Sequence, residues 1–175
     1  MNEKSVHISE LFNQFHKDVY HFALYFTNNQ QDAEDITQET FLKVMKNLHQ
    51  LKDSQKVKTW ILSITRFTAV DWIRKQHLRR VFTKALSNKS YEADMNSRSV
   101  IGKENWEDLQ RALIKLKPHF RSVIILRGLN ELSIKETAEV LQCSEGKVRV
   151  SFHRALLELK KDIRLKEGWE SYDRS

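Results

Sequence analysis

Residues 131–161 read ELSIKETAEVLQCSEGKVRVSFHRALLELKK, and this stretch predicts two helices joined by a tight turn. Ser133 precedes Glu136 by three positions, the spacing at which a hydroxyl and a carboxylate cap each other's backbone at a helix start. Residues 142–144 interrupt the apolar period, and Ser144 is suited to cap the second helix. This order of parts is typical of a helix-turn-helix, whose second helix enters the major groove of DNA.

The second helix of this stretch separates apolar from basic side chains. A stripe that recurs every three or four residues is predicted to be buried: Val148, Phe152, Ala155, Leu156, Leu159 and Ile163. The other side carries the candidate DNA-reading residues Lys147, Arg149, Val150, Ser151, His153 and Arg154. A helical hairpin with a solvated charged face explains the same pattern. DNA binding is the interpretation that we favour from these residues.

The composition of the 175 residues favours an all-α protein. Hydrophobic residues make up 40% of the chain, enough for a packed core, while four Gly and one Pro leave few turn formers. The single cysteine, Cys143, has no companion for a disulfide or a metal site. No apolar run is long enough to span a bilayer, and residues 1–12 lack a signal-peptide core. We therefore expect a cytoplasmic protein without membrane insertion.

The net charge of +7 is distributed unevenly along the chain. Residues 1–53 sum to −3, residues 54–84 to +7, residues 85–110 to −2 and residues 111–175 to +5. Two basic segments separated by acidic ones predict two separate contacts with a polyanion on one molecule.

Residues 8–51 predict two amphipathic helices. The first has apolar side chains at helical spacing over residues 8–26. The second presents an outer stripe of carboxylates, an amide and one leucine: Asp32, Asp35, Gln38, Glu39 and Leu42. The helix dipole alone favours acids in a first turn, which accounts for the two aspartates. The glutamate and the leucine lie farther along, and there a partner surface and a solvated face stay equally open.

A third helix is predicted to be capped by Thr59 and to run beyond Lys75. Trp60 is interpreted as a core residue, while the place of Trp72 stays open. The outward positions are basic: Arg66, Arg74 and Lys75, followed by His77, Arg79 and Arg80. Cations near a helix C-terminus are stabilising in themselves. This density of charge beside aromatic rings is nevertheless typical of a surface that grips phosphates and stacks unpaired bases.

The domain boundary is predicted at residues 81–102, where the apolar period is lost and Ser, Asn and acidic residues accumulate. We expect an N-terminal helical bundle over residues 1–80 and a C-terminal four-helix domain over residues 103–175, joined by a flexible linker. Helix resumes in residues 103–116, and Pro118 is suited to start the next helix. The fold class expected is therefore all-α, with two small helical domains.

Three motifs in this order resemble the extracytoplasmic-function (ECF) group of the bacterial sigma-70 family. Residues 32–48 (DAEDITQETFLKVMKNL) are similar to the family's polymerase-binding helix. Residues 59–76 (TWILSITRFTAVDWIRKQ) are similar to its helix for opening and reading the −10 element, and residues 131–160 to its −35-reading helix-turn-helix. The resemblance covers residues 8–165 and implies that the two domains are sigma region 2 and sigma region 4.

The resemblance implies a sigma factor that directs promoter-specific transcription initiation. Its partners would be promoter DNA and the RNA polymerase core, through the clamp of the largest subunit and the flap of the second. Anti-sigma inhibitors are typical of the family, and no stretch of this sequence identifies one. The chain would be cytoplasmic, nucleoid-associated when bound to polymerase, and would itself perform no covalent chemistry and need no cofactor or metal.

The resemblance also implies roles for individual residues. The polymerase-binding residues would be Asp35, Gln38, Glu39 and Leu42. The −10 residues would be Lys52, Asp53, Ser54, Gln55 and Lys56 around a flipped-out base, with Arg66, Arg74 and Lys75 on the backbone nearby. The −35 residues would be Lys147, Arg149, Val150, Ser151, His153 and Arg154.

Two positions depart from the family pattern. Phe67 stands where the third helix of the family often carries asparagine, four residues before Asp71. In the helix-turn-helix, Val150 and Ser151 stand where the family tends to a polar and a basic residue. The details of −10 recognition and the −35 sequence therefore stay open.

Two other function classes compete with this interpretation. A stand-alone helix-turn-helix regulator would have an N-terminal dimerisation domain, but dimerisation needs no phosphate-binding helix in residues 32–80. An enzyme would need a catalytic motif, and the seven His are scattered, without H-E-x-x-H, a phosphate loop or G-x-S-x-G. The sequence therefore favours the sigma factor over both.

Overall fold

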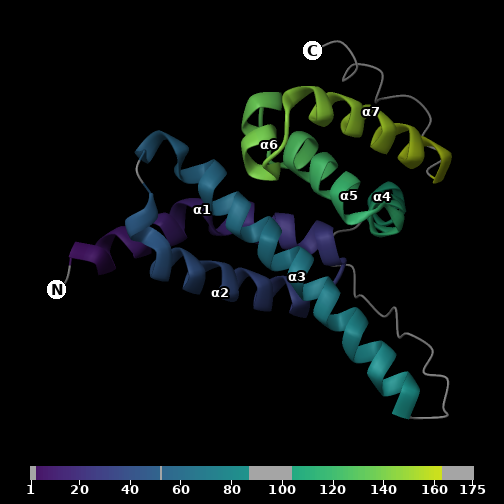
Figure 1. Ribbon diagram of the computed structural model, residues 1–175, viewed down its shortest axis with the longest axis horizontal. Coiled ribbons are helices and arrows are strands. Elements are labelled where there is room, and N and C mark those ends of the chain that lie inside the picture. Colours follow the sequence, from purple (N-terminus) through teal and green to yellow (C-terminus); the bar gives the residue numbers. More distant parts are fainter. Residues whose placement is uncertain (1–2, 52, 87–103, 163–175) are drawn as a thin grey trace.

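The computed structural model describes residues 3–51, 53–86 and 104–162, and within these ranges the chain forms helices and no strands (Figure 1). The α-helices of this part are α1 (Glu3–Thr27), α2 (Gln30–Asn47), α3 (Val57–Leu86), α4 (Glu104–Lys115), α5 (Pro118–Ile124), α6 (Ile134–Leu141) and α7 (Glu145–Asp162). Shorter turns are η1 (Leu48–Gln50), η2 (Ser54–Lys56) and η3 (Ile125–Leu129). The all-α expectation is confirmed. Lys52, Ile163 and residues 87–102 of the expected linker lie outside the described residues.

The N-terminal bundle consists of α1, α2 and α3, which contact one another pairwise. The turn between α1 and α2 is sharp because Asn28 adopts a left-handed conformation with φ of 54°, which asparagine tolerates better than most residues. Asn29 then caps α2 by accepting a hydrogen bond of 2.9 Å from the Asp32 N–H. The helices bury Val19, Phe22 and similar apolar residues from the stripes that the sequence predicted.

The third helix begins earlier than predicted and continues into the first residues of the expected linker, residues 81–102. It begins at Val57 because η2 leads directly into it, and Asp53 caps η2 by accepting from the Gln55 N–H at 2.9 Å. Thr59 is therefore inside the helix, where its hydroxyl donates to the Lys56 carbonyl, and the predicted Thr59 cap is wrong. At the other end the helix continues to Leu86, since residues 81–86 contain no Gly or Pro to stop it. In Figure 1 this end of α3 projects beyond the other helices.

The helix-turn-helix forms as its local signals predicted. Ser133 and Glu136 make a reciprocal capping box at the start of α6, with bonds of 2.7 and 3.2 Å. Gln142 ends α6 in a left-handed conformation, and the Ser144 hydroxyl accepts from the Lys147 N–H at the start of α7. Pro118 occupies the first turn of α5, as predicted.

One hydrophobic core runs through both regions. It contains Phe22 and Leu62 from the N-terminal bundle together with Leu113, Val123 and Val148 from the C-terminal helices, all buried. Accordingly α6 packs against α3, while α4, α5 and η3 contact α1. Each fully buried side chain of this kind stabilises the fold by roughly 1.5–3 kcal/mol relative to exposure, more than an exposed ion pair contributes. Apolar burial is therefore the main force that holds the two regions together.

Arg121 of α5 connects the C-terminal ends of α1 and α4 through hydrogen bonds, a role that no pattern in the sequence indicated. The residue is 7% exposed, and its guanidinium donates to the carbonyls of Leu113 and Leu116 at 2.9 and 3.0 Å and to that of Phe26. These carbonyls lie at the C-terminal ends of α4 and α1, where helical N–H donors run out, although the Leu113 carbonyl also accepts from the Leu116 N–H at 3.1 Å. Burial lowers the pKa of Arg121 to about 10, so the group stays charged at neutral pH.

Candidate nucleic-acid interface

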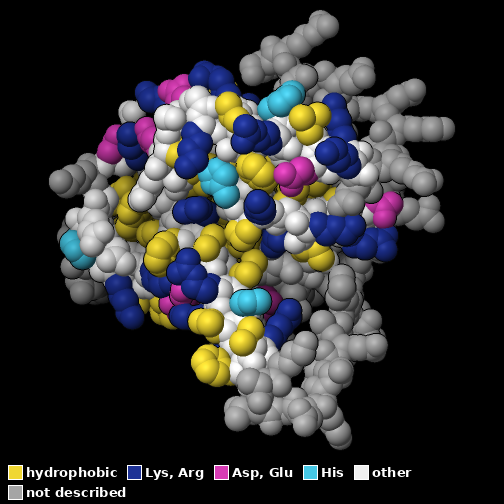
Figure 2. Space-filling view, turned by 45° about the vertical axis from the view of Figure 1, so that its right-hand side comes forward, with side chains coloured by type: hydrophobic (Ala, Val, Ile, Leu, Met, Phe, Trp, Pro, Cys, Tyr) yellow, Lys and Arg dark blue, Asp and Glu magenta, His cyan; other side chains and the backbone are white. Residues whose placement is uncertain are grey.

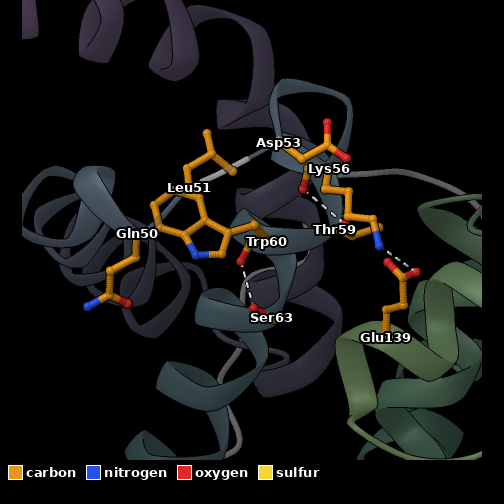
Figure 3. Close-up of a pocket in the computed structure, with 8 residues that line it drawn as sticks. All are labelled: Gln50, Leu51, Asp53, Lys56, Thr59, Trp60, Ser63 and Glu139. Atoms are coloured by element: carbon orange, nitrogen blue, oxygen red, sulfur yellow. Dashed lines mark hydrogen bonds and ion pairs between the residues drawn. The ribbon is translucent and has the colours of Figure 1, made fainter.

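A pocket of about 300 Å³ lies where the connection from α2 meets the first turns of α3 (Figure 3). Its wall contains carboxylate, amide, hydroxyl and indole groups: Gln50, Leu51, Asp53, Lys56, Thr59, Trp60, Ser63 and Glu139. Trp60 packs against the smaller core cluster of the bundle on one side and lines the pocket on the other. The interpretation of Trp60 as core is therefore incomplete, because the indole also offers a surface to a ligand.

Four of the residues predicted to take a flipped base lie at or beside this pocket. Asp53 and Lys56 line it, while Ser54 and Gln55 are exposed in η2 between them. Lys56 Nζ lies 2.9 Å from the Glu139 carboxylate of α6, and this bond and charge raise the pKa of Lys56. The helix-turn-helix region thus supplies one wall of the pocket, a contribution that the sequence did not indicate (Figure 3).

The three cations predicted on α3 lie in different environments. Arg74 is exposed, and Lys75 is exposed beside Asp71, whose pKa it lowers through an ion pair of 2.9 Å. Arg66 is half-buried instead of outward, and this burial lowers its pKa. The reason is that the C-terminal region packs on its side of α3, close enough for the Arg66 charge to affect His119.

Two aromatic side chains of α3, Trp72 and Phe67, differ in their exposure to solvent. Trp72 is half-buried and packs against the shared core, which answers the question that the sequence left open. Phe67 is 65% exposed, and Lys43 of α2 lies over its ring, with Nζ 5.8 Å from the ring centroid.

The stripe predicted to meet a protein partner lies on the outer face of α2. Asp35, Gln38, Glu39 and Leu42 are all exposed, so none is used to hold the bundle together. Leu42 is 49% exposed, and Met45 one turn farther is 52% exposed. The sequence analysis missed Met45, although its spacing of three from Leu42 was an available signal. The result is an acidic surface with an apolar part on the outer face of α2.

Five of the six candidate −35 residues are exposed on α7: Lys147, Arg149, Val150, His153 and Arg154. The prediction that Ser151 lies on the DNA-reading face is wrong. Its side chain is only 5% exposed, and its hydroxyl lies 3.0 Å from His119 Nε2. Three residues after Val148 and four before Ala155, it belongs to the buried stripe. Burial lowers the pKa of His119, and the charges of Lys147 and Arg66 lower it further, so this histidine is neutral at pH 7.

The face shown in Figure 2 carries many Lys and Arg side chains, with apolar side chains between them and fewer acidic ones. Among the described residues, no group of three His, Cys, Asp or Glu is arranged to hold a metal ion. None of the described helices combines the length and hydrophobicity that crossing a bilayer requires. The exposed cations and the apolar side chains between them are of the kinds that bind phosphates and stack on unpaired bases.

Comparison with known families matches both regions of the chain. Residues 11–79 match the family described as Sigma-70 region 2, and residues 106–159 match Sigma-70, region 4. The ECF RNA polymerase sigma factor SigX of Bacillus subtilis is 33% identical over 160 residues, which cover 89% of this chain and 82% of SigX. The RNA polymerase sigma factor YlaC of the same organism is 31% identical over 159 residues, covering 89% of this chain and 91% of YlaC.

Solved structures share the fold at lower identity. The sigma factor RpoE of Bartonella quintana, in complex with the anti-sigma factor NepR, has a TM-score of 0.75 and 20% identity, covering 91% of this chain and 98% of that chain. CnrH, in complex with the cytosolic domain of CnrY, has a TM-score of 0.65 and 20% identity, covering 88% of this chain and 85% of that chain.

Proposed function

Since the chain belongs to the extracytoplasmic-function RNA polymerase sigma factors of the sigma-70 family, we propose how its surfaces divide the work of transcription initiation. As a sigma factor it directs promoter-specific initiation by binding the polymerase core and promoter DNA. A stand-alone regulator is not favoured, because the match covers the N-terminal region as well as the helix-turn-helix.

We propose that the stripe of Asp35, Gln38, Glu39 and Leu42, extended by Met45, binds the clamp of the largest polymerase subunit. An acidic surface repels DNA phosphates, so it suits a protein partner better than the promoter. Exposed Leu42 and Met45 supply the apolar centre that protein interfaces bury, and the charged residues supply a polar rim. A contact between the C-terminal region and the flap of the second subunit completes the proposal.

The pocket in front of Trp60 is proposed to hold one flipped-out base of the −10 element. Its volume of about 300 Å³ is at the lower end of ordinary small-ligand pockets, in keeping with a single base. The Trp60 indole offers a stacking face, and Gln50 and Ser63 offer hydrogen-bonding groups at the rim. Asp53, Ser54, Gln55, Lys56 and Lys52 belong to the same proposed site, with Arg74 and Lys75 on the DNA backbone nearby.

The exposed face of α7 is proposed to enter the −35 major groove. Lys147, Arg149 and Arg154 supply charge for phosphates and donors for base edges. Val150, 50% exposed between them, is suited to contact a thymine methyl group. Ser151 has no direct role in this proposal because it faces His119.

The protein inhibitor of the RpoE relative suggests a further partner. RpoE was solved in complex with the anti-sigma factor NepR, and we propose that this chain also has a protein inhibitor.

The observation that carries the proposal is that an acidic and apolar stripe is exposed on α2, whereas Arg74 and Lys75 of α3 and the cations of α7 are exposed on other helices. The test combines the full chain with purified polymerase core and transcribes a library of genomic fragments, reading the start sites. We expect stoichiometric co-elution with the core and start sites that share two sequence elements. A chain that does not co-elute, or start sites without shared elements, would contradict the proposal.

A further inference from the structure

Phe67 is the exposed aromatic side chain nearest in sequence to the proposed base pocket. Its ring is 65% exposed and belongs to neither core cluster, whereas the flanking Arg66 is half-buried and Thr68 is buried. A single exposed ring is common on protein surfaces and means little by itself. Phe67 differs from other exposed rings in two neighbours, the pocket in front of Trp60 and the cation Lys43.

The first neighbour is the pocket itself. Trp60, Ser63 and Phe67 are spaced by three and four residues, so they lie on one face of α3. Trp60 and Ser63 line the pocket (Figure 3), and Phe67 follows roughly 6 Å farther along the helix axis at 1.5 Å per residue. Arg74, exposed, comes seven residues later on the same face. Along this face the order is therefore pocket, ring and cation.

The second neighbour is a fixed cation. Lys43 reaches from α2 to donate to the Thr68 hydroxyl at 3.1 Å and pairs with Glu39 at 3.3 Å. These bonds hold Nζ 5.8 Å from the centre of the Phe67 ring. Along the helix face the ring thus lies between a pocket that fits one base and the exposed Arg74, a cation that attracts phosphates, while the paired Lys43 lies over the ring.

We infer that Phe67 is a stacking platform for the unpaired base next to the one held in the pocket. This inference rests on the proposed role of the pocket in −10 recognition. A phenyl ring has no hydrogen-bonding group, and every base has a π-face, so the platform accepts any of the four bases. Phe67 therefore stabilises the open strand without selecting the sequence at this position. It is a positioning residue for promoter opening.

The experiment uses polymerase holoenzyme assembled from purified core and the full chain. The probes are promoter forks whose −10 non-template strand is single-stranded, in a series with an abasic site at each successive position. Phe67→Ala should weaken binding to the complete fork by about 5- to 150-fold, the range for loss of one base–aromatic stack. On the fork that lacks the neighbouring base, Phe67→Ala and the unchanged chain should bind equally. Phe67→Trp, which keeps an aromatic ring at this position, should bind the complete fork as tightly as the unchanged chain does.

Two results would overturn the inference. One is an equal loss on every fork of the series, since a stacking contact must couple to one position. The other is loss of core binding by Phe67→Ala, which would place the ring in the polymerase interface beside Glu39. Replacement of each base of the fork by the other three, in turn, is an independent check. The base that couples to Phe67 should tolerate all four identities, and a strong preference there would contradict the platform.

A control separates this inference from the proposed function. Gln50→Ala alters the pocket at an exposed residue and should couple to a different, adjacent base. If Gln50→Ala couples to a base and Phe67→Ala couples to none, the platform is wrong and the pocket stands. If neither variant couples to any position, the pocket and the platform are both wrong.

Discussion

Lys56 and Glu139, 83 residues apart in the sequence, lie 2.9 Å from each other at the edge of the pocket in front of Trp60. Lys56 belongs to the proposed −10 surface, whereas Glu139 belongs to the first helix of the helix-turn-helix. In this arrangement the Glu139 carboxylate lies beside the proposed −10 surface, where it repels DNA phosphates. It also neutralises Lys56, a cation that would otherwise attract them. At the proposed −10 site, Glu139 therefore opposes phosphate binding by Lys56.

Glu139→Gln should raise the affinity of the free protein for a single-stranded −10 oligonucleotide. The gain should be at most about fivefold, because an exposed ion pair contributes roughly 0–1 kcal/mol and the shared apolar core stays intact. Fluorescence anisotropy at low salt measures it. Asp108→Asn, which removes the same charge from an exposed pair with Arg111, is the matched control and should change nothing. A decrease in affinity for Glu139→Gln would contradict the prediction.

Glu39→Arg and Arg149→Ala should impair different activities. Glu39→Arg reverses a charge of the proposed polymerase surface, so co-elution with the core should be lost. Arg149→Ala should leave core binding intact and weaken promoter binding of the holoenzyme by about 1–3 kcal/mol. Arg111→Ala, an exposed arginine of α4, is the control for charge loss. If Glu39→Arg and Arg149→Ala reduced core binding equally, the separation of the two surfaces would be refuted.

Arg74→Ala should lower the salt dependence of promoter binding. Each Lys or Arg that neutralises a phosphate releases counterions, so losing one contact should reduce the slope of log K against log[salt] by about one. The effect should be the same on promoters of different sequence, because a phosphate contact reads no base. Titrations at several salt concentrations measure it, and an unchanged slope would show that Arg74 does not meet the backbone.

Arg121→Met should destabilise the fold without touching a proposed binding surface. The substitution removes the Arg121 donors from the carbonyls of Phe26 and Leu116, which costs about 1–3 kcal/mol, while the Leu113 carbonyl keeps its bond from the Leu116 N–H. Denaturant unfolding at neutral pH measures the loss. Arg111→Met, in which the side chain is exposed and pairs only locally with Asp108, should have little effect. Similar losses for both variants would contradict the role of Arg121.

His119 should make the fold less stable in mild acid. Its pKa is below the ordinary value in the folded state, mainly through burial and also through Lys147 and Arg66. As pH falls below about 6.5, the unfolded chain therefore binds this proton before the folded chain does, and the free energy of unfolding decreases. His119→Asn should show a shallower decrease between neutral pH and about pH 5.5. Equal slopes for the variant and the unchanged chain would rule this contribution out.

The local signals in the sequence were sufficient for the helices and their order. The capping box at Ser133 and the proline at the start of α5 act within a few residues, so a linear pattern reports them directly. Helical periodicity likewise predicted the buried stripes and the exposed acidic surface of α2. The predicted Thr59 cap failed because η2 runs directly into α3, so the chain is capped earlier, by Asp53 at the start of η2.

Only the tertiary structure decided which side chains face the other region. Ser151 is turned inward beside His119, and Lys56 is joined to Glu139 across the pocket. Arg121 binds the carbonyl of Phe26, 95 residues earlier in the chain. Contacts across such separations leave no pattern along the sequence, because they depend on how the packed helices are placed and not on the period of any one helix. The sequence by itself determined the helices and their charged faces, and packing around one shared core determined which of those faces stay free to bind.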